Sequence, residues 1–94
     1  MYQISVTTYP ENNGRTLGVS SKEVFDELIS QIMVKFSDSK IDWNTYMSYV
    51  STGKHNVYEI DLEQRSNEGV WSMVEHHEFL ENPEIISFLR NNSR

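Results

Sequence analysis

Residues 20–36 carry an apolar repeat with the spacing of an α-helix, and segments that alternate between apolar and polar residues flank it on both sides. Ser20 and Glu23 have the spacing of a capping box, which is typical of a helix start. The apolar residues then recur every three or four positions, at Val24, Phe25, Leu28, Ile29, Ile32, Met33 and Phe36. A helix with one apolar stripe needs an apolar surface to cover, and we expect it to lie on a sheet formed by the alternating segments.

The alternating segments predict strands that bury one face each. Residues 2–7 and 58–63 alternate strictly, which is typical of half-buried strands. Residues 10–14 are rich in turn formers, so residues 16–19 are expected to return as the second strand of a hairpin. Residues 69–74 predict a further strand, with a helix as the close competitor.

Residues 41–50 have an ambiguous pattern, because they alternate like a strand but also fit a helix capped by Asp42. Their tryptophan, tyrosine, threonine and valine favour the strand. Asn82 and Pro83 predict the cap and first residue of a final helix. The expected order is β-β-α-β-β-β-α, which is a single α+β domain over residues 1–94 with about five antiparallel strands and two helices packed on one face.

Length and composition limit what else the chain contains. Ninety-four residues suffice for one core. The absence of cysteine leaves no disulfide framework and no cysteine-based metal site. The first nine residues lack the basic start and apolar run of a secretion signal, and no stretch has the length and apolarity of a membrane span. We therefore expect a cytoplasmic protein without a membrane partner.

The negative charge is concentrated in one part of the sequence. Residues 59–84 contain eight acidic residues and one base, Arg65, which gives −7 in a chain whose total is −6. Like charges held side by side repel each other, so such a cluster is either tolerated on a solvated face or used to bind a basic partner. Composition alone leaves both interpretations open.

One group of acidic residues has the spacing of a strand. Alternate residues of a strand lie about 6.5–7 Å apart on the same face. Glu59, Asp61 and Glu63 are therefore predicted to form a row of carboxylates that resembles spaced phosphates. We expect these carboxylates to face water and to keep ordinary pKa values.

A second group depends on the structure of residues 75–80. If this segment is helical, Glu75, Glu78 and Glu81 form another acidic stripe, since residues three apart share a helix face. The candidate partner-binding residues are Glu59, Asp61, Glu63, Glu68, Glu75, Glu78 and Glu81.

The aromatic residues of 41–50 bear on this surface. In a strand, Trp43 and Tyr49 face one way and Tyr46 the other, so we expect Tyr46 to be exposed. An exposed aromatic side chain beside the acidic row would supply an apolar anchor within a charged rim.

No pattern in the chain predicts catalysis. His76 and His77 are adjacent, so they point in different directions on a helix or a strand, and they lack the spacing of a two-histidine metal motif. Nucleophile elbows, phosphate loops and dinucleotide fingerprints are also missing. We expect no enzyme activity, no catalytic residues, no metal and no cofactor. The scattered bases disfavour direct binding of nucleic acid.

These features favour a small non-enzymatic inhibitor that presents a DNA-mimic-like carboxylate face to the basic site of a nuclease or another nucleic-acid-binding protein. The broad class of viral anti-restriction and anti-CRISPR proteins, produced by phages, is analogous. An immunity or antitoxin protein that blocks a toxic nuclease relies on the same electrostatics. An assembly subunit with no inhibitory role is the other alternative, and a homodimer is compatible with each of these functions.

Overall fold

The computed structural model describes residues 1–93, and within this range the chain forms four strands, three α-helices and one short 3-10 helix. In chain order the elements are β1 (Tyr2–Tyr9), β2 (Asn13–Val19), α1 (Lys22–Lys35), η1 (Ser37–Ser39), α2 (Trp43–Thr52), β3 (Val57–Arg65), β4 (Trp71–Leu80) and α3 (Pro83–Asn92). None of the helices in the described range is both long enough and apolar enough to cross a bilayer.

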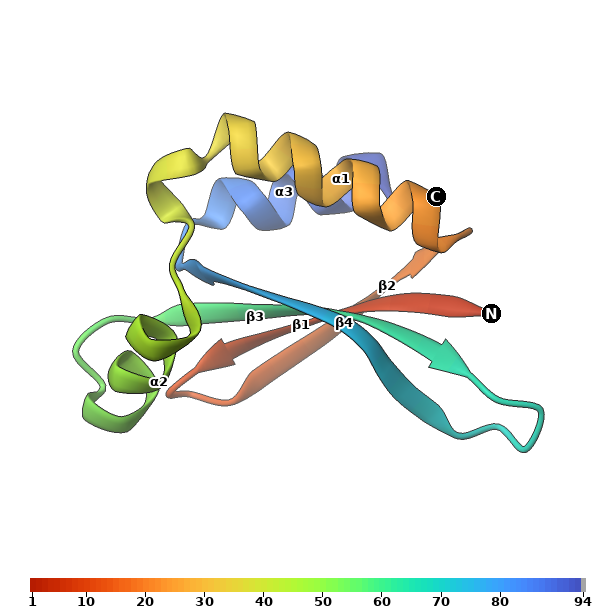
Figure 1. Cartoon of the computed structure of the whole chain (residues 1–94), viewed down its shortest axis with the longest axis horizontal. Helices are drawn as coiled ribbons and strands as arrows, with labels where there is room; N and C mark the ends of the chain where they lie inside the picture. Colours follow the sequence, from red (N-terminus) through yellow and green to blue (C-terminus); the bar gives the residue numbers. More distant parts are fainter. Residues whose placement is uncertain (94) are drawn as a thin grey trace.

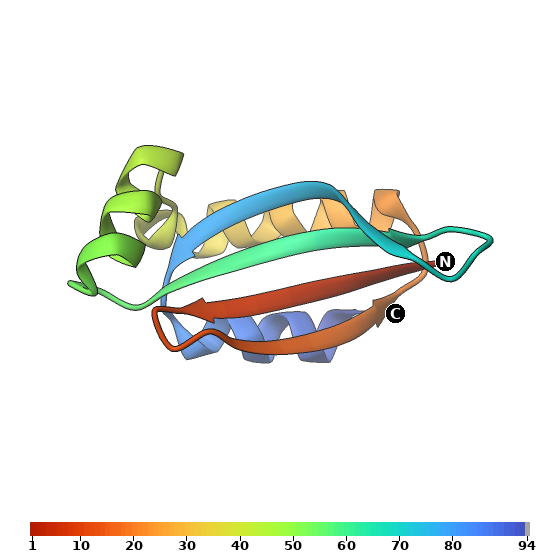
Figure 2. The same ribbon diagram turned by 90° about the horizontal axis from the view of Figure 1, so that it is seen from below.

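The four strands form one antiparallel sheet in the order β2-β1-β3-β4. Figure 1 shows α1 and α3 side by side on one face of this sheet, with α2 at one end. Figure 2 shows the molecule turned by 90° and seen from below, so that the strands lie in front of α1 and α3. The α+β class and the helices on one face agree with the sequence prediction.

The core lies between the sheet and the two long helices. Ile4 and Ile60, from the two central strands, are fully buried, and so are Phe25 and Ile32 from α1. The apolar stripe predicted for α1 is the stripe that packs here. The helix begins one residue later than the capping-box pattern indicates, because the Ser21 hydroxyl accepts the N–H of Val24 at 3.2 Å.

The strand predicted for residues 41–50 is wrong, since this segment is the helix α2. Asp42 caps the helix by accepting the N–H of Thr45 at 2.7 Å, and Gly53 ends it with a left-handed φ of 70°. Strand propensity reflects packing within a sheet, and this segment has no neighbouring strand. The described chain therefore has four strands and three α-helices, instead of about five and two.

The second half of the acidic region is a strand, and β4 is longer than the predicted segment 69–74. Leu62 pairs with Glu75 and Glu63 pairs with Met73, which leaves Val74 as a β-bulge. The acidic stripe that depended on a helix at residues 75–80 does not form. Alternation along the strand places Glu75 and Glu78 on opposite faces of the sheet.

Candidate functional site: the open face of the sheet

The face of the sheet that α1 and α3 leave uncovered carries a row of carboxylates on the central strand β3. Tyr58, Ile60 and Leu62 are buried on the helix-covered face, so the alternate residues project to the other side. Glu59, Asp61 and Glu63 lie there, opposite Thr7, Ser5 and Gln3 of β1. Their common face agrees with the alternation in the sequence.

A fourth carboxylate joins this row from β4. Glu78 is the register partner of Glu59, and His76 is the register partner of Asp61. We call Glu59, Asp61, Glu63 and Glu78 the open-face carboxylates. Figure 2 shows the strands that carry them, with β3 between β1 and β4.

Neutral side chains and a histidine hold three of these carboxylates in place. The Tyr46 hydroxyl donates to Glu59 Oε1 at 2.7 Å, and Gln3 Nε2 donates to Glu63 Oε1 at 2.7 Å. His76 Nδ1 bonds to Glu78 Oε2.

No lysine or arginine among residues 1–93 forms an ion pair with any open-face carboxylate within 4.0 Å. Within the described chain, these carboxylates therefore have no directly paired lysine or arginine. A cation supplied by another molecule would meet carboxylates that have no competing strong base beside them.

Asp61 departs from the expectation of ordinary pKa values. Its Oδ1 atom is buried and has no hydrogen-bond partner in the described part of the chain. Burial raises the pKa of Asp61 to about 8, and the nearby Glu59, Glu63 and Glu78 add to the rise. Asp61 is therefore mostly protonated at neutral pH, and the open face carries one charge fewer than its composition indicates.

Glu78 departs from the expectation of exposure to water, since it is only 5% exposed. The segment leading into α2 pairs with the edge of β4 at this end, where Lys40 forms a bridge with Phe79 and the Ile41 N–H donates to the Glu78 carbonyl at 3.4 Å. The Trp43 ring lies 5.3 Å from the His76 ring, edge to face. Residues 40–43, which lead into the helix that the sequence prediction missed, therefore lie beside this end of β4.

Tyr46 is buried, so the prediction that it is exposed is wrong, and Trp43 is the exposed aromatic residue of α2. Tyr46 is 3% exposed, because its ring packs against Tyr9 and Trp43 and its hydroxyl reaches Glu59. Burial and the hydrogen bond to Glu59 raise the pKa of Tyr46. Trp43 is 48% exposed and stacks on Tyr46, with ring centroids 5.2 Å apart and 28° between the planes. A helical interpretation of the Asp42 cap would have placed these two residues on one helix face.

The structure does not bring the other three candidate residues to the open face. Glu75 lies on the helix-covered side, where it accepts from Lys22 at 3.2 Å and bonds to His77 Nε2 at 2.8 Å. Glu68 lies in the exposed turn between β3 and β4. Glu81 follows β4 and accepts from Asn56 at 3.3 Å.

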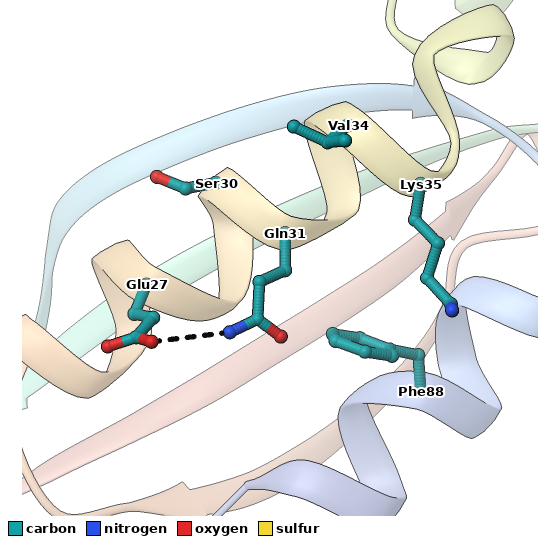
Figure 3. Close-up of a pocket in the computed structure, with 6 residues that line it drawn as sticks. All are labelled: Glu27, Ser30, Gln31, Val34, Lys35 and Phe88. Carbon is teal, nitrogen blue, oxygen red and sulfur yellow. Dashed lines mark hydrogen bonds between the residues drawn. The ribbon is translucent and has the colours of Figure 1, made fainter.

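A groove between α1 and α3 lies on the opposite side of the molecule. Figure 3 shows its lining of Glu27, Ser30, Gln31, Val34, Lys35 and Phe88. The groove has a volume of about 550 Å³, and Val34 on its rim is 82% exposed. The hydrogen bond from Gln31 to Glu27, at 3.3 Å, is the polar contact drawn in Figure 3.

The fold and the site define a small α+β protein with an uncovered, carboxylate-bearing sheet face. Within residues 1–93, no three histidine, aspartate or glutamate side chains are arranged to hold a metal ion. Comparison of the chain with models of protein families, with curated proteins and with solved structures found no significant match. The function is therefore inferred from the geometry and charge of this chain.

Proposed function

We propose that this protein is a non-enzymatic inhibitor that binds a basic surface of a nucleic-acid-binding protein, such as a nuclease, through the open face of its sheet. The observation that carries the proposal is the row of Glu59, Asp61 and Glu63 on the strand face that α1 and α3 leave open, without a lysine or arginine partner in the described chain. A surface of this kind is complementary to a patch of lysine and arginine side chains.

Inhibition would follow from competition. Basic residues that hold phosphates would instead face carboxylates about 6.5–7 Å apart along the strand. Opposite charges accelerate association and make it sensitive to salt, since the screening length falls to about 8 Å at physiological ionic strength. Glu59 and Glu63 flank the mostly protonated Asp61 on the same strand face and would carry most of the attraction.

The test compares two variants that remove equal charge from different places. The open-face variant is Glu59→Gln with Glu63→Gln, which keeps an acceptor for Tyr46 and Gln3. The control variant is Glu68→Gln with Glu81→Gln, at exposed positions away from that face. Each tagged protein is used to capture proteins from a lysate of its native cells at low and high salt, and the captured proteins are identified and purified.

The expected result is capture of a nucleic-acid-binding protein by the wild type and the control, release by salt, and affinity weakened on the order of tenfold or more in the open-face variant. The purified target should also lose its nucleic acid when the wild type is added. Equal binding by both variants, or a target that keeps its nucleic acid, would contradict the proposal. A homo-oligomer that resists salt would support an assembly subunit instead.

A further inference from the structure

We propose that Trp43 is the anchor of the open-face interface and that its exposed ring receives an arginine side chain of the basic partner. This inference rests on the proposed function, because it assigns the chemistry of one contact within that interface. Trp43 is the first residue of α2, at the end of the sheet where the helix meets the open-face carboxylates.

Trp43 has no role in the hydrophobic core. Its side chain is 48% exposed, and it does not belong to the buried cluster between the sheet and the long helices. About half of this large apolar side chain is exposed to water, and its burial by a partner would stabilise a complex. Tryptophan is also enriched among the residues that dominate binding energy at protein interfaces.

The ring is held in a fixed orientation before any partner arrives. Tyr46 stacks against it at 5.2 Å, and His76 lies edge to face at 5.3 Å. Tyr46 is buried and donates its hydroxyl to Glu59, while His76 bonds to Glu78. A partner therefore does not have to order this side chain, which lowers the entropic cost of binding.

The same contacts place the ring beside negative charge. Each of its two aromatic neighbours is bonded to an open-face carboxylate, Glu59 or Glu78. The nearby Lys40 directs its ammonium to the backbone carbonyls of Ile41 and Glu78, at 3.1 and 3.3 Å. A cation that stacks on Trp43 would thus gain both the cation–π attraction and the field of these carboxylates.

Arginine fits this surface better than lysine. The planar guanidinium stacks on an aromatic face while its edge donates hydrogen bonds to carboxylates. The lysine ammonium is a compact charge that water hydrates more strongly, so it loses more hydration free energy when a partner surface displaces the water. The partner side chain at Trp43 is therefore assigned as arginine.

The experiment uses the two tryptophans of the chain, Trp43 and Trp71. Trp71→Phe leaves Trp43 as the only indole, and this protein is titrated with oligoarginine and oligolysine peptides of equal length. Oligoarginine is expected to change the Trp43 emission and to bind severalfold more tightly than oligolysine. In the same background, Trp43→Leu is expected to lower the affinity for oligoarginine about tenfold, measured by calorimetry.

A second variant separates binding from folding. Trp43→Phe keeps an aromatic ring and is expected to recover part of the lost affinity, while circular dichroism and thermal melting report whether each variant keeps its fold. Equal affinity for both peptides, unchanged affinity in Trp43→Leu, or no binding of oligoarginine would overturn the assignment.

The failure of this inference is distinguishable from the failure of the proposed function. If Glu59→Gln with Glu63→Gln weakens capture of the nucleic-acid-binding target and Trp43→Leu does not, the acidic face binds the partner without the Trp43 anchor. If neither change weakens capture, both proposals are wrong.

Discussion

The two faces of the central strands β1 and β3 carry side chains that differ in burial and polarity. On the helix-covered face, Ile4, Ile60 and Leu62 are fully buried under α1 and α3. On the open face, the neighbouring Ser5 and Asp61 pair across the same two strands. One set of side chains stabilises the fold, and the other leaves charge and polar groups available to a partner.

The side chains of the two faces are expected to make opposite contributions to the stability of the fold. A buried Ile or Leu side chain contributes roughly 1.5–3 kcal/mol to folding. The pKa of Asp61 is raised, which means that ionising its carboxyl group costs more free energy in the folded protein than in the unfolded chain. Opposite consequences are therefore expected when residues of the two faces are changed.

The largest effect is expected on the helix-covered face. Leu62→Ala removes a fully buried side chain from β3 and leaves a cavity under the helices. The free energy of unfolding should fall by about 2–5 kcal/mol, measured by urea denaturation at neutral pH. A loss below about 1 kcal/mol would mean that this face is not the core.

Substitution of Asp61, the neighbour of Leu62 on the open face, is expected to increase the free energy of unfolding. The folded-state pKa of Asp61, about 8, lies above its ordinary value of 3.8. The contribution of its proton to stability is complete below the ordinary pKa, declines as pH rises, and is lost once the pH passes the folded-state value. At pH 9 the folded protein holds Asp61 as a disfavoured carboxylate, and Asp61→Asn removes this charge, so the free energy of unfolding should rise. The expected increase is about 1–2 kcal/mol, since partial solvent contact screens the charge and reduces the effect.

The pH dependence supplies the control for this prediction. Near pH 4, wild type and Asp61→Asn should have nearly equal stability, and the difference should grow as the pH increases. Urea denaturation over this pH range measures both curves. Parallel curves would show that Asp61 titrates normally.

A smaller effect is expected where α2 joins the open face. Asp42→Ala removes the side chain that accepts the Thr45 N–H at 2.7 Å. The free energy of unfolding should fall by about 1 kcal/mol, as for other helix caps. Asp42→Asn, which keeps an acceptor, should lose less, and equal losses in both variants would argue against capping.

The sequence predicted the elements whose signals are long or local. The apolar stripe of α1 extends over residues 24–36, and the cap at Asn82 marks the start of α3. The alternation of residues 58–63 also predicted the shared face of Glu59, Asp61 and Glu63. These patterns depend only on neighbouring residues, so a single sequence contains them.

The structural features that the sequence did not predict depend on contacts between distant segments. Whether β4 continues through Glu78 is decided by pairing with β3, and the edge of β4 at Glu78 also bonds to the segment that leads into α2. The pKa of Asp61 results from side chains of two strands packed together, which alternation cannot reveal. The exposure of Trp43 and the burial of Tyr46 likewise required the helix that strand propensity obscured.

The most direct measurement is a map of amide chemical shifts by NMR during titration of the full chain with oligoarginine at low salt. If the open face binds basic partners, the changes should concentrate at residues 59–63, 76–78 and 43–46, disappear at high salt, and weaken in Glu59→Gln with Glu63→Gln. Changes concentrated instead in the groove between α1 and α3, or spread evenly over all acidic positions, would contradict a binding role for the open face.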